Sequence, residues 1–104
     1  MNEIEFLATE VMGWELNFHP NMEDSYYMPS GINKADWNPR KNIAQAMGLL
    51  DQFDDWTVGK IDNVHGCLIT FSTINEQHKS KNLYLTNAIC DAVLKAKGFS
   101  DENT

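Results

Sequence analysis

The chain has 104 residues, of which 42% are hydrophobic and 22% charged, so we expect one domain, residues 1–104, built around a single modest core. Its formal net charge of −7 disfavours non-specific nucleic-acid binding, which depends on Lys and Arg neutralising phosphates. No apolar run reaches the roughly 18 residues of a membrane span, and the acidic start Met-Asn-Glu-Ile-Glu is unlike a secretory signal. We therefore expect a cytoplasmic protein with no membrane contact.

The N-terminal segment carries apolar residues at helical spacing. Asn2 is the expected N-cap, Gly13 the expected end, and the apolar face comprises Ile4, Leu7, Ala8, Val11 and Met12. Apolar residues then alternate with polar ones, which predicts a short strand containing Trp14, Leu16 and Phe18. Turn-forming residues from His19 to Asp36 predict a long loop, which is uncommon in a small domain unless it has a role. Its residues Tyr26, Tyr27 and Met28 could either pack or bind a ligand.

The middle of the chain predicts a helix and a hairpin. Asn38 and Pro39 have the pattern of an N-cap followed by Pro at the first helical position, and the expected buried face comprises Ile43, Ala46, Met47, Leu50 and Phe53. Residues 56–62 and 66–73 are predicted to form two strands joined by Asp-Asn-Val-His-Gly. On the second strand, one face is expected to hold Cys67, Ile69 and Phe71.

The last element is a helix expected within residues 80–98, preceded by a polar loop over residues 75–81. Its apolar face comprises Leu85, Ala88, Ile89, Ala92, Val93 and Ala96. Thr86 or Asn82 can cap its start, and Gly98 suits the left-handed position after its end. Together the elements predict an α+β fold of about three helices and a hairpin, in which helices cover a small antiparallel sheet on at least one face. Three amphipathic helices are enough for layers on both faces, which would make an α-β-α sandwich.

Catalytic and metal sites have little support in the sequence. It contains no glycine-rich phosphate loop, no HExxH and no nucleophile elbow, so no catalytic residue, cofactor or metal is expected. His65 and Cys67 share a strand face and could form a dyad, but a turn histidine beside a core cysteine is the simpler interpretation. A loop metal site at His19, Glu23 and Asp24 is a similarly weak alternative. We expect Cys67 and Cys90 to be buried free thiols.

A nucleotide pocket is the more specific hypothesis. Trp37 precedes Arg40 and Lys41 at an expected helix start, so a base could stack on the indole while a phosphate meets the cations and helix amides. The ring of Tyr26 or Tyr27 could cover the opposite face of the base. A second anion contact is predicted around the start of the last helix, from Lys79, Lys81 and Thr86. Solvated lysines beside a core helix are the alternative interpretation of that group.

Several short segments resemble the phage ABA-sandwich domain family. These are Val-Met-Gly-Trp at 11–14, the Asn-Pro helix start at 38–39 with small and apolar residues after it, and Thr86 followed by Ala-Ile-Cys at 88–90. The resemblance runs nearly end to end, except that residues 15–36 carry no motif that aligns. It implies a small protein of a bacterial virus or prophage, located in the infected cell, with a small sheet between helical layers.

The resemblance also implies a function as a possibility. Most members of the family have no known activity, but some small phage proteins similar to it act as sponges, which are homo-oligomers that bind cyclic nucleotide signals of host antiphage defence without cleaving them. We therefore expect a non-enzymatic immune-evasion protein whose ligand is a small nucleotide, with a cyclic dinucleotide foremost. The alternatives are an acidic inhibitor of a host protein, which would use the carboxylates of residues 3–24, and a virion or assembly component.

Overall fold

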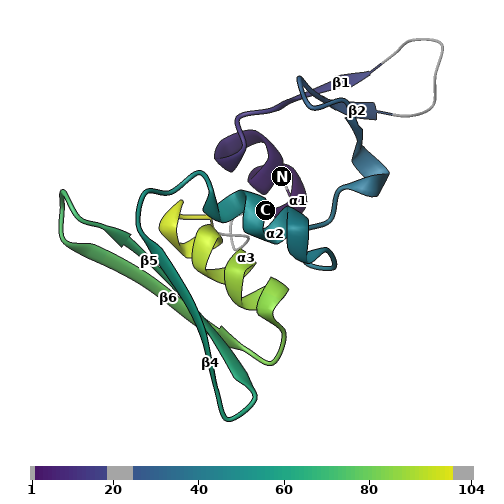
Figure 1. The fold of residues 1–104 in the computed structure, drawn as a ribbon. Helices are drawn as coiled ribbons and strands as arrows, with labels where there is room; N and C mark the ends of the chain where they lie inside the picture. The colour runs from purple at the N-terminus through teal and green to yellow at the C-terminus, as the bar shows by residue number, and fades with distance from the viewer. Residues whose placement is uncertain (1, 19–24, 100–104) are drawn as a thin grey trace.

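The computed structural model describes residues 2–18 and 25–99 (Figure 1). Its helical segments are α1 (Glu3–Phe6), a π-helical turn (Leu7–Val11), a 3-10 turn (Lys34–Asp36), α2 (Ile43–Leu50) and α3 (Leu85–Ala96). Its strands form two antiparallel sheets, which are β1 (Glu15–Phe18), β2 (Ser25–Met28) and β3 (Ile32–Asn33), and β4 (Trp56–Ile61), β5 (Val64–Phe71) and β6 (Glu76–Asn82). No helix among the described residues has the length and apolar character needed to span a bilayer.

The N-terminal helix begins and ends as predicted. The side chain of Asn2 accepts a hydrogen bond of 2.8 Å from the backbone N–H of Glu5, and Gly13 after the helix has a φ of +74°. The predicted strand is confirmed as β1. The long loop predicted up to Asp36 is wrong in its second half, because β2 pairs with β1 on one side and with β3 on the other. Residues 19–24 lie outside the described part.

The central hairpin is confirmed, with a shorter turn than predicted. Asp62 and Asn63 alone connect β4 to β5, and both have positive φ values, 51° and 68°. This is the type I′ geometry whose twist matches that of paired strands, and Asn and Asp tolerate it. Cys67 and Ile69 are buried on one face of β5, as the alternation predicted.

The polar segment predicted as a loop before the last helix is strand β6. Its seven residues, EQHKSKN, contain no apolar side chain, but all of them pair with β5. Ser80 is buried, and its hydroxyl donates a hydrogen bond to the carbonyl of Ala88 in α3. Strand formation here depends on the neighbouring strand rather than on local hydrophobicity, so the sequence pattern did not reveal it.

Helix α3 is therefore shorter than predicted and lacks the predicted cap. It begins at Leu85, and Tyr84 at the N-cap position makes no side-chain capping bond, so neither Asn82 nor Thr86 caps it. Its end is as predicted. Gly98 has a φ of +73°, and Phe99 and Gly98 donate to the carbonyls of Leu94 and Lys95 in a Schellman arrangement.

Helix α2 begins four residues later than the Asn-Pro pattern predicted. Asn42 is its N-cap and accepts a 3.0 Å hydrogen bond from the N–H of Gln45. The Asn38 side chain instead accepts from the N–H of Arg40 in a local turn. Ile43, predicted to be buried, is 47% exposed, because it occupies the first helical position on the outer side.

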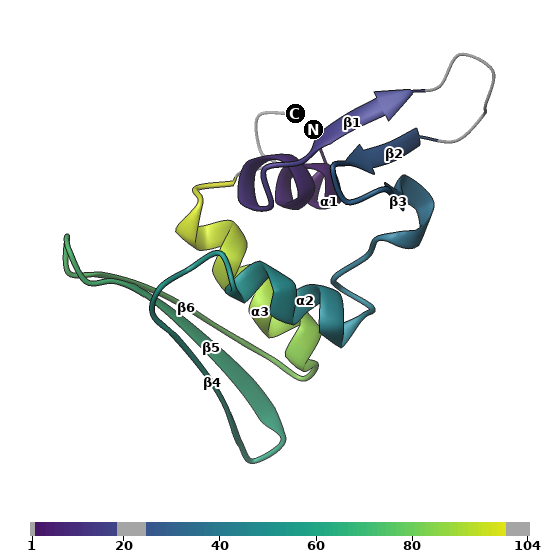
Figure 2. The same cartoon turned by 45° about the horizontal axis from the view of Figure 1, so that its top comes forward.

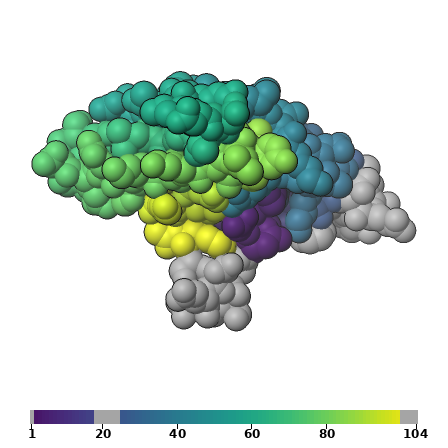
Figure 3. All heavy atoms as spheres, turned by 90° about the horizontal axis from the view of Figure 1, so that it is seen from below, coloured from purple at the N-terminus to yellow at the C-terminus, as the bar shows by residue number. Residues whose placement is uncertain are grey.

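One hydrophobic core joins these elements. Helix α3 packs between α2 and the β4–β6 sheet, and its buried residues include Ala88, Ile89, Ala92 and Val93. The predicted α+β sandwich class is confirmed, with two three-stranded antiparallel sheets around the helices (Figure 2). The β4–β6 strands extend beyond α3 (Figures 1 and 3), and the described helices lie against one face of that sheet.

Candidate binding surface

The predicted aromatic side chains lie in the core rather than in a pocket. Trp37 is 3% exposed and Tyr27 is fully buried. The Trp37 ring centre lies 5.3 Å from that of Trp14 and 5.9 Å from that of Tyr27, both in edge-to-face geometry. Neither the indole of Trp37 nor the phenol of Tyr27 presents an open ring face to a ligand in this structure. Tyr26, half-buried on the opposite face of β2, is separated from both by the strand.

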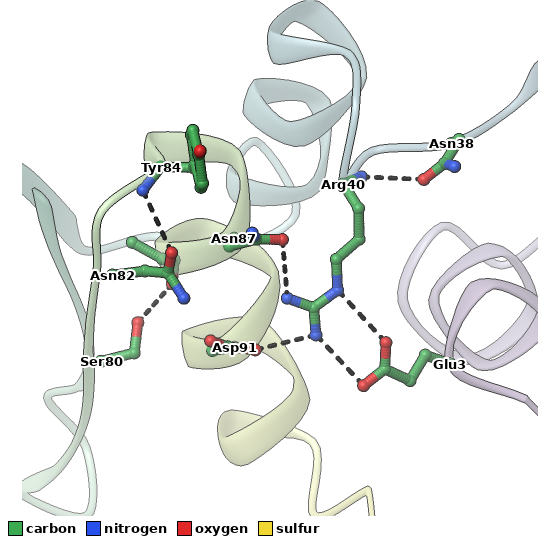
Figure 4. Close-up of polar contacts among 9 residues, drawn as sticks. Glu3, Asn38, Arg40, Ser80, Asn82, Tyr84, Asn87 and Asp91 are labelled. Atoms are coloured by element: carbon green, nitrogen blue, oxygen red, sulfur yellow. Dashed lines mark hydrogen bonds and ion pairs between the residues drawn. The ribbon is translucent and has the colours of Figure 1, made fainter.

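Arg40 is held by side chains of the protein itself (Figure 4). Its guanidinium donates 3.2 Å and 3.1 Å hydrogen bonds to the two carboxylate oxygens of Glu3, one of 3.0 Å to Asn87, and lies 2.8 Å from Asp91. This bidentate fork and the second carboxylate satisfy the charge, so Arg40 joins α1 to α3 instead of facing solvent for a phosphate. Burial opposes the charged form of Arg40, but the bonds to Asp91 and Glu3 leave its pKa raised.

The remaining predicted cations lie elsewhere. Lys41 is exposed in the turn before α2, and Thr86 is half-buried in the first turn of α3. Figure 4 shows α3 between Arg40 and the β6 residues Ser80 and Asn82. Because Lys79 and Lys81 belong to β6, they are on the sheet side of α3, away from Arg40. The structure thus does not bring the eight predicted residues together.

Lys79 and Lys81 share the face of the β4–β6 sheet that points away from α3. The strand register aligns Thr57, Leu68 and Lys79 in one row and Gly59, Gly66 and Lys81 in the next. Ser80 and Cys67, at alternate positions, point toward the helices and are buried. We call this surface the outer face, defined by residues 57, 59, 61, 64, 66, 68, 70, 77, 79 and 81.

The glycine pair on the outer face is not required by the backbone. Gly59 and Gly66 pair directly, and neither has a positive φ. A Cβ at Gly59 would have no atom within 4 Å, and one at Gly66 would meet only the Ser80 carbonyl at 3.8 Å, an ordinary contact. Glycine within a strand lowers stability and often marks a place where a ligand or another backbone approaches closely. The pair therefore forms a flat patch of backbone without side chains, which we call the floor. The fold does not require glycine at either position.

The charge of the outer face differs from that of the whole chain. Its strand residues include Lys79 and Lys81 but no Asp or Glu, whereas the protein has 15 acidic and 8 basic residues. Both lysines are exposed, and no described carboxylate forms an ion pair with either. The surface offers two uncommitted cations beside an uncharged floor, which suits an anionic ligand with a flat portion.

The weaker catalytic alternatives find no support in the described residues. His65 and Cys67 do share the inner face of β5, but burial raises the pKa of the Cys67 thiol to about 11, so its nucleophilic thiolate is disfavoured. Burial likewise raises the pKa of Cys90 to about 12. Both cysteines are free and buried, as predicted. No three potential metal ligands gather among the described residues, and the His19, Glu23 and Asp24 alternative falls outside them.

The sequence alone did not identify Gly59 and Gly66 as part of a candidate site. Gly59 and Gly66 had no motif around them, and only the register shows that they are opposite each other. The signal that was available is a glycine in the middle of the first predicted strand, Gly59, and another at the start of the second, Gly66. Lys79 and Lys81 were selected from the sequence, but for a place at a helix start that strand pairing excludes.

Fold and surface together define a small α+β protein whose principal sheet is helix-covered on one face and presents glycines and lysines on the other. The chain belongs to the phage ABA sandwich domain family, whose model matches residues 5–94. Membership makes it a small phage protein. No curated protein and no solved structure matches the chain.

Proposed function

We propose that this phage protein binds and sequesters a cyclic nucleotide signal of host antiphage defence, without cleaving it, and that it does so as a homo-oligomer. The observation that carries the proposal is the Gly59–Gly66 floor beside Lys79 and Lys81. A base can lie flat on backbone that has no Cβ, while lysine ammonium groups pair with phosphates as point charges. The site is thus moved from the predicted Trp37 and Arg40 pocket to the outer face.

The family supports a phage setting for this role, and the charge pattern supports an anionic ligand. A protein of net charge −7 repels polyanions at long range, which favours a small ligand held locally over a nucleic-acid strand. Such a binder needs tight contacts and no catalytic group. The proposal therefore requires only that the protein binds its ligand tightly and with a defined stoichiometry.

The acidic-inhibitor alternative is less well supported. Glu3 pairs with Arg40, and Glu5 lies 3.0 Å from the ammonium of Lys34. Two of the N-terminal carboxylates therefore interact within the chain and are not free to imitate a phosphate backbone. An inhibitor of this kind would also bind its host partner less tightly as ionic strength rises.

The experiment is a thermal-shift screen against cyclic dinucleotides, cyclic trinucleotides and linear nucleotides. A ligand at about 100 times its dissociation constant adds roughly 2.7 kcal/mol to the free energy of unfolding. We expect a selective rise in melting temperature with one cyclic nucleotide, which chromatography then recovers intact. No rise with any nucleotide would overturn the proposal, and a cleaved nucleotide would reassign the protein as an enzyme.

Three variants locate the site. Gly59→Val places a side chain on the floor where the structure has free space, so we expect a folded protein that no longer binds. Lys81→Ala should weaken binding roughly tenfold, or about 1.4 kcal/mol. The matched control is Lys41→Ala, which removes an exposed lysine from the turn before α2 and should leave affinity unchanged. Wild-type affinity in both Gly59→Val and Lys81→Ala would exclude the outer face.

A further inference from the structure

Strand β4 is an open edge of the principal sheet. The N–H of Thr70 donates a 3.0 Å hydrogen bond to the carbonyl of Asp55, which fixes the alternation of bonded pairs along β4 and β5. Since hydrogen-bonded pairs alternate in an antiparallel ladder, the N–H and C=O groups of Trp56, Val58 and Lys60 point away from β5. No described group forms a hydrogen bond with these outward groups.

The opposite edge of the same sheet is partly covered. By the same alternation, the carbonyl of Lys79 in β6 points outward, and the ammonium of Lys95 from α3 donates a 3.0 Å hydrogen bond to it. Strand β6 is also rich in charged and polar side chains, and it lies beside α3 whereas β4 lies at the far side of the sheet (Figure 2). Lysines and a covering helix are common protections of sheet edges, so β6, with two lysines and α3 beside it, is better protected than β4, which has only Lys60.

We infer that two copies of this chain pair through their β4 strands, antiparallel and about a two-fold axis at Val58, to form one six-stranded sheet. Of the antiparallel registers that match outward groups with outward groups, only the one centred on Val58 pairs all three outward residues of β4. Val58 then faces Val58 of the second copy, and Trp56 faces Lys60 of the second copy. All three side chains are on the helix-side face, where Trp56 and Val58 are only partly buried, so pairing extends the apolar cover.

The charges at the ends of β4 are more complementary in the antiparallel arrangement than in an in-register parallel one. Asp54 and Asp55 precede the strand, Lys60 stands near its end, and Asp62 follows in the exposed turn. Antiparallel pairing brings Lys60 of each copy beside the Trp56 ring and the Asp54–Asp55 pair of the other, which adds a cation–π contact and an ion pair on each side. In-register parallel pairing would set Lys60 opposite Lys60 and Asp54 opposite Asp54. The antiparallel register sets like charges opposite each other only at Asp54 and Asp62, where the chain enters the hairpin turn. This complementarity favours a second copy over an unrelated strand.

The inference can be tested without nucleotide, so its outcome is separate from that of the proposed ligand. Sedimentation analysis and native mass of the full chain should give a dimer. Val58→Pro removes an outward N–H but no hydrogen bond inside the sheet, so we expect a folded monomer by circular dichroism. A monomeric wild type, or a dimer that survives Val58→Pro, would overturn the inference.

A charge exchange provides a second test that does not rely on the proline variant folding. Lys60→Glu alone, and Asp54→Lys with Asp55→Lys, should each weaken self-association because like charges then meet at both ends of the interface. Mixing the two variants should give a heterodimer, since each copy then presents the complement of the other. Lys41→Glu makes the same charge change on an exposed residue outside β4 and should leave the dimer intact. Failure of the mixture to form heterodimers would count against this register.

Discussion

The guanidinium of Arg40 forms a two-pronged hydrogen bond with the carboxylate of Glu3, at 3.2 Å and 3.1 Å, and so joins the turn before α2 to the first turn of α1. The same guanidinium lies 2.8 Å from Asp91 of α3. Three segments far apart in the sequence thus meet at one cation. This contact is the main polar link between the N-terminal helix and the helical pair that covers the principal sheet.

Arg40→Ala should destabilise the fold. It leaves Glu3 and Asp91 facing each other without a cation, and their partial exposure limits the loss to about 1–2 kcal/mol. For a domain of this size that corresponds to a fall in melting temperature of very roughly 4–16 °C. Arg40→Lys keeps the charge but loses the two-pronged hydrogen bond, so its melting temperature should lie between those of the wild type and Arg40→Ala. A melting temperature equal to that of the wild type would show that the link contributes nothing.

Tyr27→Phe should leave stability unchanged or raise it. Within the described residues the Tyr27 hydroxyl is buried and has no hydrogen-bond partner, and an unsatisfied buried polar group costs about 1–3 kcal/mol. Desolvation by burial also raises the pKa of this phenol. Urea unfolding measures the change, with Tyr26→Phe on the half-buried side of β2 as the matched control. A clear loss of stability in Tyr27→Phe would indicate a partner for the hydroxyl.

The two cysteines should be unreactive while the protein is folded. Burial raises the pKa of Cys67 to about 11 and of Cys90 to about 12, so little thiolate forms near pH 8 and the reagent has no access. Ellman's reagent should label both thiols only in denaturant. Rapid labelling of either thiol in the native protein would contradict the burial described here.

The raised thiol pKa values also predict a loss of stability at alkaline pH. Between their ordinary value of 9.0 and the folded values of about 11 and about 12, the unfolded thiols release protons that the folded thiols retain. The folded state then binds more protons, so the free energy of unfolding falls as pH rises through this window. Urea unfolding at a series of pH values measures the slope. A free energy of unfolding that rises with pH above 9.0 would contradict this prediction.

The hairpin turn should be sensitive to side-chain identity at Asn63. Its φ of 68° is left-handed, where Asn is tolerated and Ala costs roughly 1 kcal/mol. Asn63→Ala should therefore lower the free energy of unfolding by about that amount, whereas Asn63→Gly fits the type I′ turn and should not. Chemical denaturation of both variants checks the difference. Equal stability of the two variants would show that the turn geometry does not limit the hairpin.

Local signals in the sequence determined much of the fold. Asn2 and Gly98 marked helix ends through capping and left-handed geometry, and periodic apolar residues identified α1, α3 and the inner face of β5. These features depend on interactions within a few residues, so a single sequence contains them. Burial of the thiols followed from the same patterns.

Tertiary structure alone decided the rest. Strand β6 has no apolar residue, and it is a strand because β5 supplies its hydrogen bonds. The sequence predicted that Trp37 and Arg40 would bind a ligand beside a helix start. Core packing instead buries the indole, and the carboxylates of α1 and α3 form ion pairs with the guanidinium. Gly59 and Gly66 form one floor only after the hairpin register places them opposite each other. Which cations stay free depends on partners distant in sequence, because long-range pairing determines both burial and charge neutralisation.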